Sequence, residues 1–226
     1  TRIKKAIDIL ESYLINEKLI FEIIIVDDGS TDATSTIVKE LASKYQNLKL
    51  NKNDRNTGKG YSVKRGMLES CGKYALFTDA DMSTPIEEIE KIFSYLKEGF
   101  DIVIGSRRMK YSKIKVFQPP IRRFLGWLFH MIRRIFYLQN IRDTQCGFKC
   151  FKKEVIKPIF DRQTINGFVF DVEILFIASK LGFKIKEIPV VWIDDIRSTL
   201  MPGKHLKEVA RDLLKIRFNW IKGIYE

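Results

Sequence analysis

Short apolar runs alternate with helical patterns over the first hundred residues of this chain. The runs at 21–26, 74–77 and 101–105 are rich in apolar and β-branched residues and are too short for surface helices. Residues 48–50 offer a further short strand. Apolar spacing predicts helices between and before them, at 3–14, 33–45, 61–70 and 86–96. This alternation predicts an α/β fold with a doubly wound, mostly parallel sheet flanked by helices.

Charged residues follow the expected strands at their carboxyl ends. Asp27 and Asp28 follow the first run, Asp79 and Asp81 follow the second, and Arg107 follows the third. Ligands of open α/β sheets bind at the carboxyl ends of the strands. The sequence therefore predicts that these side chains converge on one binding site.

Asp79 and Asp81 are separated by Ala80 where a buried strand ends. Two carboxylates one residue apart point to the same side, and like charges this close repel unless a cation neutralises them. Mg²⁺ or Mn²⁺ is bound by one or two carboxylates and fills its other positions with water and phosphate oxygens. The alternative is a solvated turn in which Asp81 caps the helix that begins near Thr84-Pro85.

The stretch Asp27-Asp28-Gly29-Ser30-Thr31-Asp32 closes one strand and opens a helix. Ser30 or Thr31 is expected to cap that helix, and Asp32 suits its positive end. Capping does not explain why Asp27 and Asp28 are adjacent. A carboxylate at a strand end can accept the imino N–H of uracil or guanine, so the pair also predicts a contact with a nucleotide base. The glycine spacing matches neither the P-loop nor the dinucleotide fingerprint.

Two cations, one near an expected helix start and one after an expected strand, are candidates for phosphate contacts. Lys59, within Asn56-Thr57-Gly58-Lys59-Gly60, lies near an expected helix start and could meet a phosphate or ribose. Arg107, within Ser106-Arg107-Arg108, could bind a pyrophosphate bidentately. A plain loop and a solvated strand end remain the respective alternatives.

The stretch 106–142 holds ten Lys or Arg residues and no acid, within a chain of formal net charge +12. Such charge favours an anionic partner: a nucleotide, a nucleic acid or an acidic lipid surface. An apolar helical stripe lies on one side of this stretch with Trp127 nearby, and four arginines fall on the other side: Arg122, Arg123, Arg133 and Arg134. We expect a helix that lies in the membrane interface.

Two other interpretations of the basic stretch stay open. It could be a buried amphipathic helix, or it could line a nucleic-acid groove. The aromatic residues lie on or near the apolar stripe instead of between the arginines, as base stacking would require, so nucleic acid is not the expected partner.

The second half contains further acids in unusual surroundings. Asp143 directly follows Arg142, where an ion pair is commoner than a catalytic base. Asp171 and Glu173 fall in an apolar helix over 168–179 and need partners, for which the basic region is a source. Residues 183–192 are expected to be extended, and residues 206–221 are expected to form a basic amphipathic helix.

Three cysteines without metal spacing indicate reduced thiols in a cytosolic compartment. No apolar run approaches a membrane span, and no signal peptide is evident.

Together these motifs resemble the family 2 glycosyltransferases of the GT-A fold. The resemblance covers nearly the whole chain and rests on four motifs: Asp27 to Asp32, Gly58-Lys59-Gly60, Asp79-Ala80-Asp81 and Gly105-Ser106-Arg107. Within the family, Arg142-Asp143-Thr144-Gln145-Cys146-Gly147-Phe148-Lys149 and Phe170-Asp171-Val172-Glu173 are similar to the dolichyl-phosphate β-glucosyltransferase branch. Dolichyl-phosphate mannose synthases are more distant there.

The resemblance implies a role for each matching residue. Asp28 would hold the base, with Val26 touching it through the backbone, and Asp79 would lie near the ribose. Asp81 would ligate Mg²⁺ or Mn²⁺, with Asp79 and Ser83 close by. Arg107 would face the diphosphate, while Asp143 and Gln145 would position the acceptor or sugar. The implied donor-binding set is Val26, Asp27, Asp28, Lys59, Asp79, Ala80, Asp81 and Arg107.

The implied reaction moves glucose from UDP-glucose to a polyprenyl (dolichyl) phosphate, with inversion, at the cytoplasmic face of a membrane. We expect a nucleotide-sugar half at 1–108, a membrane-interface segment at 109–142 and an acceptor-side half at 143–226. Family members usually begin with a strand ending in Pro-x-Tyr-Asn-Glu, so that strand is expected to be missing from the first half. The alternatives are a transferase using GDP-mannose or building a polysaccharide and, more remotely, a basic nucleic-acid-binding module.

Overall fold

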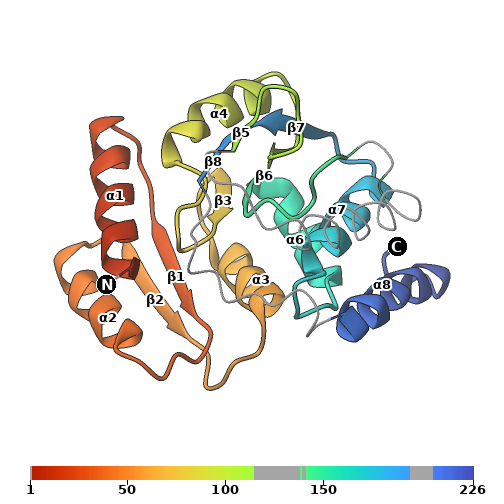
Figure 1. The fold of residues 1–226 in the computed structure, drawn as a ribbon, viewed down its shortest axis with the longest axis horizontal. Helices are drawn as coiled ribbons and strands as arrows, with labels where there is room; N and C mark the ends of the chain where they lie inside the picture. Colours follow the sequence, from red (N-terminus) through yellow and green to blue (C-terminus); the bar gives the residue numbers. More distant parts are fainter. Residues whose placement is uncertain (1, 115–137, 139–140, 194–205) are drawn as a thin grey trace.

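A computed structural model describes residues 2–114, 138, 141–193 and 206–226 (Figure 1). Its first unit is a parallel pair of strands, β1 (Ile23–Asp27) and β2 (Leu48–Lys52). Two helices pack on this pair, α1 (Arg2–Asn16) and α2 (Thr34–Lys44). The helices turn an apolar stripe toward the strands, and the buried residues of this small core are Ile7, Leu14, Ile23, Val38, Leu41 and Leu48.

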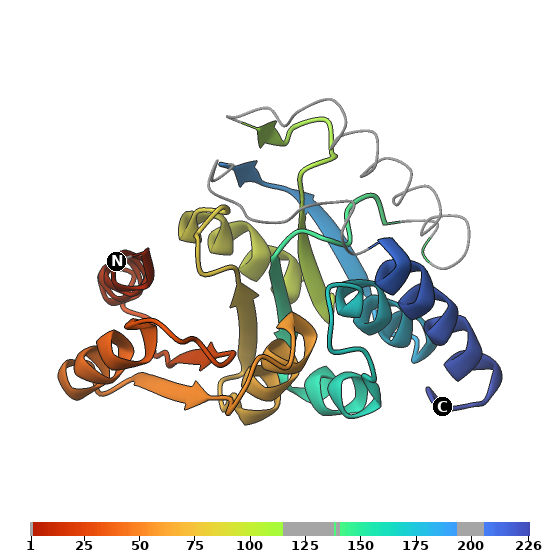
Figure 2. The same ribbon diagram turned by 60° about the horizontal axis from the view of Figure 1, so that its bottom comes forward.

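The larger sheet has four strands in the order β3 (Tyr74–Thr78), β6 (Phe148–Lys152), β4 (Ile102–Ser106) and β7 (Ile185–Pro189). β4 and β7 are parallel, whereas β6 runs antiparallel to both β3 and β4. The first residue of β6 therefore lies at the same edge as the last residues of β3 and β4 (Figure 2). A short parallel pair, β5 (Lys113–Ile114) and β8 (Val191–Trp192), completes the strands of the described residues.

Side chains of the four-stranded sheet alternate between two cores, as the period of two of a strand requires. Val103 faces the core beneath η1 (Ile86–Glu88) and α4 (Ile89–Lys97). Its neighbours Ile102 and Ile104 face the opposite core. That second core lies among three helices, α3 (Lys59–Glu69), α6 (Lys153–Arg162) and α7 (Phe170–Lys180).

α7 is buried on all sides, because every residue from Phe170 to Ala178 is buried. A helix that is apolar all round is expected in the interior. The last helix, α8 (Leu206–Ile221), lies on the outer side of α7 in Figures 1 and 2. Its residues Leu213 and Ile216 join the core of α7.

The predicted α/β arrangement is confirmed, and most expected elements occur within a few residues of their predicted positions. β6 and α6 were not predicted, because Lys149 and Lys152 interrupt the apolar pattern of that strand. The expected parallel order holds for β1–β2 and β4–β7, while β6 makes the central sheet mixed.

Several expectations fall outside the described residues. These include the interfacial helix and its residues Arg122, Arg123, Trp127, Arg133 and Arg134. The division of the chain at 108 and 142 stays a prediction, although β6 and β7 from the last segment share a sheet with β3 and β4 from the first. Among the described helices, none combines the length and apolar character that crossing a bilayer demands.

Candidate active site

The predicted residues of β3 and β4 meet at one edge of the central sheet. Asp79 directly follows β3, and Arg107 directly follows β4. Because β6 is antiparallel, the loop 141–147 that precedes it reaches the same edge. The backbone N–H of Asp79 donates to the carbonyl of Gly147 at 3.1 Å. A Cβ atom at position 147 would lie 1.9 Å from Asp79 Oδ2, so only glycine fits there.

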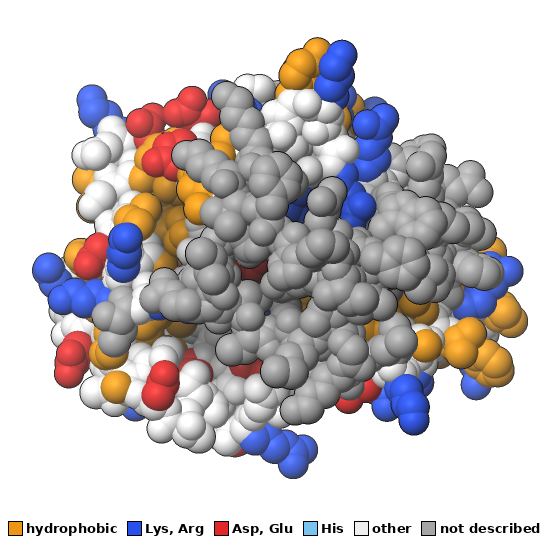
Figure 3. Space-filling model, viewed as in Figure 1, with side chains coloured by type: hydrophobic (Ala, Val, Ile, Leu, Met, Phe, Trp, Pro, Cys, Tyr) orange, Lys and Arg blue, Asp and Glu red, His pale blue; other side chains and the backbone are white. Residues whose placement is uncertain are grey.

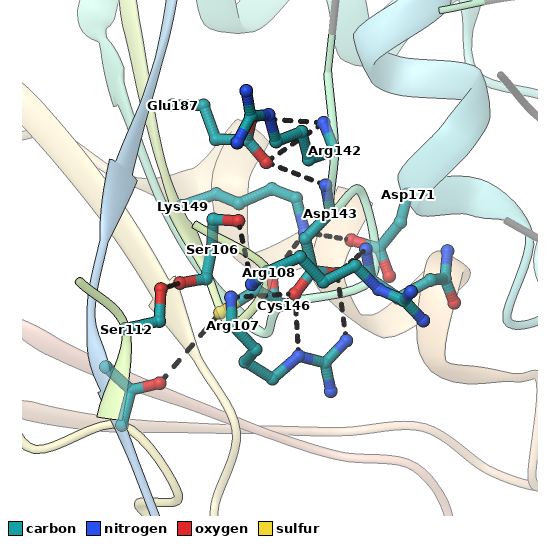
Figure 4. A network of polar contacts seen from close by, with 12 residues as sticks. Ser106, Arg107, Arg108, Ser112, Arg142, Asp143, Cys146, Lys149, Asp171 and Glu187 are labelled. Atoms are coloured by element: carbon teal, nitrogen blue, oxygen red, sulfur yellow. Dashed lines mark hydrogen bonds and ion pairs between the residues drawn. The ribbon is translucent and has the colours of Figure 1, made fainter. Parts of the chain in front are cut away.

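Arg107 and Asp143 form a bidentate ion pair at this edge (Figure 4). The Nε and Nη2 atoms of Arg107 donate to Asp143 Oδ2 and Oδ1 at 2.7 and 2.9 Å. The backbone N–H of Arg107 donates to Asp143 Oδ2 as well, at 3.0 Å. The guanidinium also lies over the ring of Trp192, 5.3 Å from its centroid. The pair thus fixes one face of Arg107 against the protein.

Asp143 is almost completely buried and is held by donors on both oxygens. Besides the three donors of Arg107, the backbone N–H of Gln145 donates to Asp143 Oδ1 at 3.1 Å. Burial alone would raise the pKa of Asp143, but the charge and hydrogen bonds of Arg107 outweigh it and hold the pKa well below its ordinary value. Asp143 is therefore ionised, and the expected ion pair is formed with Arg107.

The loop that carries Asp143 is anchored by Glu187, a residue of β7. Glu187 accepts hydrogen bonds from the backbone N–H groups of Arg142 and Asp143 (Figure 4). Nothing in the local sequence around Glu187 predicted this contact, because β7 comes beside β4 only through the fold. The side-chain Nε2 of Gln145 is buried and has no hydrogen-bond partner among the described residues. It is thus a donor in need of an acceptor.

A second ion pair lies in the interior, directly beneath the site. The ammonium of Lys149 donates to Asp171 Oδ1 at 2.6 Å and to the carbonyl of Cys146 at 2.5 Å. Both side chains are buried. Burial raises the pKa of Asp171, although Lys149 and Lys59 oppose the shift. The expected partner from the basic region is wrong, since the partner of Asp171 is Lys149 of β6.

Glu173 also differs from the expectation of a cationic partner. Its carboxylate accepts hydrogen bonds from the backbone N–H groups of Thr164 and Ile165. The hydroxyls of Thr164 and Tyr225 donate to it as well, both at 2.7 Å. Four donors without a formal charge therefore satisfy this fully buried acid.

Lys59 lies at the start of α3 and reaches the carboxylate that follows β3. Its ammonium is 2.5 Å from Asp79 Oδ1. Burial works against the charged form of Lys59, but Asp79 and Asp171 outweigh it and raise its pKa above the ordinary value. The preceding Gly58 has a φ of +105°, and a Cβ there would lie 2.4 Å from the carbonyl oxygen of Asn166. This close approach lets Asn166 accept the backbone N–H of Gly60 at 2.7 Å.

Asp81 accepts fewer hydrogen bonds from described residues than Asp143 does. The backbone N–H of Ser83 donates to Asp81 Oδ1 at 2.9 Å, and no described residue donates to its other oxygen. Ser83 is buried and Ala80 is exposed. Three acids of the group each pair with a cation: Asp79 with Lys59, Asp143 with Arg107 and Asp171 with Lys149. Among the described residues, no ion pair involves Asp81.

The residues around Asp81 fit a divalent cation that also needs outside ligands. The described residues contain no group of three or more His, Cys, Asp or Glu side chains that could hold a metal ion alone. Asp79 and Asp81 supply carboxylate oxygens, the ligands that Mg²⁺ and Mn²⁺ favour. Phosphate and water would complete such a coordination sphere.

Asp27 and Asp28 lie at the end of β1 and have different partners. Asp27 is buried, and it accepts hydrogen bonds from the backbone N–H of Ser30 at 2.9 Å and from the hydroxyl of Ser35. Asp27 therefore ties the turn to α2. Ser30 and Thr31 do not cap that helix as expected: its N-cap residue is Ala33, which makes no side-chain capping bond.

Asp28 holds the loop that leads to Lys59. Its carboxylate accepts the backbone N–H groups of Thr57 and Gly58 at 2.9 and 2.8 Å, the Thr57 hydroxyl at 2.7 Å and the Asn53 amide at 2.9 Å. Partial burial opposes ionisation, but these hydrogen bonds lower the pKa of Asp28. Val26, two residues earlier, points toward α3, where a Cβ on Gly66 would lie 3.1 Å from Val26 Cγ2.

Asn53 was not predicted as part of the site. It is buried, bonds Asp28, and accepts a hydrogen bond from Arg65 Nη1 at 2.9 Å. Through loop 53–59 the Asp28 end of β1 is connected to the Asp79 end of β3. The structure thus brings Lys59, Asp79, Asp81, Arg107 and Asp143 together and places Asp28 beside the loop that carries Lys59.

The three cysteines are free, as expected. Cys71 is exposed, whereas Cys146 and Cys150 are buried. Burial raises the pKa of Cys146 to about 11 and that of Cys150 to about 12. Neither buried thiol is therefore ionised near neutral pH, which argues against a cysteine nucleophile at this edge.

Comparison with protein families identifies the profile named glycosyl transferase family 2, which matches residues 2–160. A dolichyl-phosphate β-glucosyltransferase from Dictyostelium discoideum is 38% identical over 216 residues, which cover 92% of this chain and 66% of that protein. The chain spans 61% to 66% of the length of the curated relatives it matches.

Solved structures match the fold at low identity. Mannosyl-3-phosphoglycerate synthase from Rubrobacter xylanophilus gives a TM-score of 0.66 at 15% identity, covering 97% of this chain and 70% of that one. The mannosyltransferase PcManGT from Pyrobaculum calidifontis, solved with GDP-Man and Mn²⁺, gives a TM-score of 0.58 at 18% identity. The match covers 98% of this chain and 60% of the PcManGT chain. These neighbours confirm a fold of the GT-A type.

Proposed function

The chain belongs to glycosyl transferase family 2, and from this premise we propose that its protein transfers glucose from UDP-glucose to a polyprenyl (dolichyl) phosphate with inversion. One observation carries the proposal: the Arg107–Asp143 pair lies at the same strand edge as the Lys59–Asp79 pair and Asp81. Cations that can meet a diphosphate and acids that can hold a metal ion thus come together. The relatives' name supports the choice of sugar and acceptor.

The donor would bind between Lys59 and Arg107. Asp28 would meet the base together with the backbone of Val26, and Asp79 would lie near the ribose. Asp79 and Asp81 would hold Mg²⁺ or Mn²⁺, with Ser83 orienting the carboxylate of Asp81 through its backbone N–H. Such an ion neutralises charge on a leaving nucleoside diphosphate. The solved mannosyltransferase with Mn²⁺ supports this choice of cofactor.

Asp143 acts in this scheme as a positioning residue. Both of its oxygens accept hydrogen bonds from Arg107, and its pKa is well below the ordinary value. A carboxylate this acidic is a weak base, so it does not collect the proton of an acceptor. It holds Arg107 toward the donor, while Arg107 Nη1 is not part of the bidentate contact.

A phosphate acceptor makes a strong protein base unnecessary. A phosphate monoester with a second pKa of about 6 is mostly dianionic at pH 7, so its oxygen can attack without losing a proton to the enzyme. The buried Nε2 of Gln145, which lacks a partner among the described residues, would donate to the acceptor or to the sugar.

The acceptor head group of a polyprenyl phosphate lies at a bilayer surface, so the protein must work there. Arg122, Arg123, Trp127, Arg133 and Arg134 would provide a contact with the cytoplasmic face. About 1 kcal/mol per basic residue near an anionic leaflet makes such a contact effective.

The test is transfer by the purified full-length protein from a panel of radiolabelled nucleotide-sugars to dolichyl phosphate. We expect a lipid-linked product only with UDP-glucose, only with Mg²⁺ or Mn²⁺, and with the β configuration. A product from GDP-mannose alone would replace the donor in this proposal. No transfer from any donor, together with salt-sensitive RNA binding, would overturn it.

A further inference from the structure

Helix α8 carries two apolar faces, and only one of them is covered. The inner face packs Leu213 and Ile216 into the core of α7, and Trp220 contacts the ring of Phe176 with centroids 5.8 Å apart. The outer face carries Leu214, Phe218 and Ile221, which are 70%, 62% and 70% exposed. Spacings of four and three residues place these side chains on one stripe of the helix.

We call Leu214, Phe218 and Ile221 the outer stripe. A surface helix normally turns a polar face to water, and neighbouring exposed apolar side chains on one face mark an interaction site. In Figure 3 hydrophobic and basic side chains lie together at the lower right, over α8.

Basic residues flank the outer stripe. At 100° per residue, Arg211, Lys215 and Lys222 lie on one side of it and Arg217 lies on the other. Lys222 lies over the ring of Phe218, 5.2 Å from its centroid, and Arg217 lies over Trp220 at 4.7 Å.

The helix carries two acids, Glu208 and Asp212. Asp212 is turned toward the body of the protein: its side chain is only 14% exposed, lies beside Gly167 and pairs with Arg211 at 3.4 Å. Glu208 is exposed, but it lies in the first turn of the helix, away from Phe218 and Ile221. Around the exposed apolar side chains the cations therefore outnumber the acids.

We infer that this outer stripe docks on an anionic membrane surface, with the flanking cations meeting lipid head groups. An apolar stripe bordered by Lys and Arg is the arrangement of helices that lie in the bilayer interface. A second copy of the chain fits less well. A two-fold contact through the stripe would bring the cations of both copies together, and like charges at an interface are unfavourable.

None of the residues of this surface belongs to the basic stretch at 109–142, and the inference does not depend on the transfer reaction. The inference also places the membrane near loop 53–59, which carries Lys59. Lys215 Nζ donates to the carbonyl of Thr164 at 3.1 Å, and two residues later Asn166 accepts the backbone N–H of Gly60. A membrane contact at α8 would thus lie one short loop away from Lys59.

The direct test places an environment-sensitive fluorophore on the outer stripe. Leu214→Cys in a Cys71→Ser background is labelled and mixed with vesicles of phosphatidylcholine containing about 30% phosphatidylserine. The matched control is Ile15→Cys on α1, a position 59% exposed. We expect a blue shift for the label at 214 and none for the label at 15. An unshifted label at 214 overturns the inference.

A second measurement removes the apolar stripe itself. The variant Leu214→Gln/Phe218→Gln/Ile221→Gln should lower vesicle co-sedimentation about tenfold, because three exposed apolar side chains no longer enter the bilayer. The matched control, Ile9→Gln/Ile15→Gln/Ile20→Gln, should leave it unchanged. Equal co-sedimentation of the α8 variant and the parent overturns the inference. So does a dimer in sedimentation velocity that the α8 variant abolishes, because a second copy would then cover the stripe.

Discussion

The two acid pairs that end β1 and β3 look alike in sequence and differ in the folded protein. At the end of β1, Asp27 and Asp28 accept hydrogen bonds that fix the start of α2 and the loop before Lys59. At the end of β3, Asp79 pairs with Lys59 while Asp81 keeps one oxygen without a described donor. The first pair therefore fixes the loops of the site, whereas in the second pair Asp81 keeps acceptor capacity for a ligand.

The number of donors around a strand-end carboxylate decides how much acceptor capacity it keeps. Asp27 accepts from the backbone N–H of Ser30 and the hydroxyl of Ser35, and Asp28 accepts four hydrogen bonds from loop 53–59. The turn at 79–83 offers Asp81 only the N–H of Ser83. A carboxylate with unused acceptor capacity can bind a cation from outside the chain.

The largest expected effect is that of Asp81→Asn. We expect transfer activity, measured as kcat/KM for UDP-glucose, to fall on the order of 10³-fold, because the change removes a charge offered to the metal ion. The melting temperature should hardly change, since the amide oxygen can still accept the N–H of Ser83. The control is Asp54→Asn, which removes an exposed acid. If the activity of Asp81→Asn stays within threefold of the parent, the proposal that Asp81 binds the metal ion is wrong.

Asp143→Asn should have the next largest effect, and it should act on stability as well. Removing one partner of a buried ion pair leaves the other uncompensated and costs about 3 kcal/mol. Urea unfolding measures this loss. Transfer should also fall, because Arg107 loses the contact that orients it. A variant with parental stability and a transfer rate within tenfold would remove Asp143 from the positioning role.

Asp27→Asn should reduce stability and leave transfer nearly unchanged, the reverse of Asp81→Asn. We expect a loss of about 1–2 kcal/mol in unfolding free energy, because the amide group cannot accept from both Ser30 and Ser35. The folded fraction should keep its transfer rate within about threefold. A large loss of activity at unchanged stability would show that Asp27 contacts the ligand.

The smallest effect is a pH dependence of stability. Hydrogen bonds lower the pKa of Asp27 and of Asp28 in the folded state, although burial opposes this. As the pH falls below about 4, the unfolded chain therefore takes up protons first, and the stabilisation from these acids is lost. Asp27→Asn lacks one such group, so it should lose less stability than the parent between pH 5 and 3, by about 1 kcal/mol or less. Parallel losses in urea melts would contradict this expectation.

The spacing of apolar residues was enough to predict most of the strands and helices. The apolar runs that became β1, β3 and β4 and the stripes of α1, α4 and α8 were visible in sequence because burial on one face leaves a period. The strand-end acids and Arg107 were predicted for the same reason: carboxyl ends of strands form the binding edge. β6 was missed because its lysines hide a buried strand.

Lys149 shows why such a residue escapes prediction. A fully buried lysine is acceptable only beside Asp171, and that partner comes from α7, 22 residues later. The same holds for Glu187, whose contact with the 142–143 backbone requires β7 to lie beside β4. Such pairings join residues distant in sequence, and no local period reports them.

Most of the strands and helices and the acids that end the strands could be predicted from the amino-acid sequence, because those features depend on neighbours a few residues away. Which acids are fully hydrogen-bonded within the protein, and which keep an oxygen for a ligand, follows from the fold, because the donors around a carboxylate come from segments distant in sequence. For Asp143 the main donor is Arg107, directly after β4, and for Asp171 it is Lys149 of β6, the strand that runs antiparallel to β4.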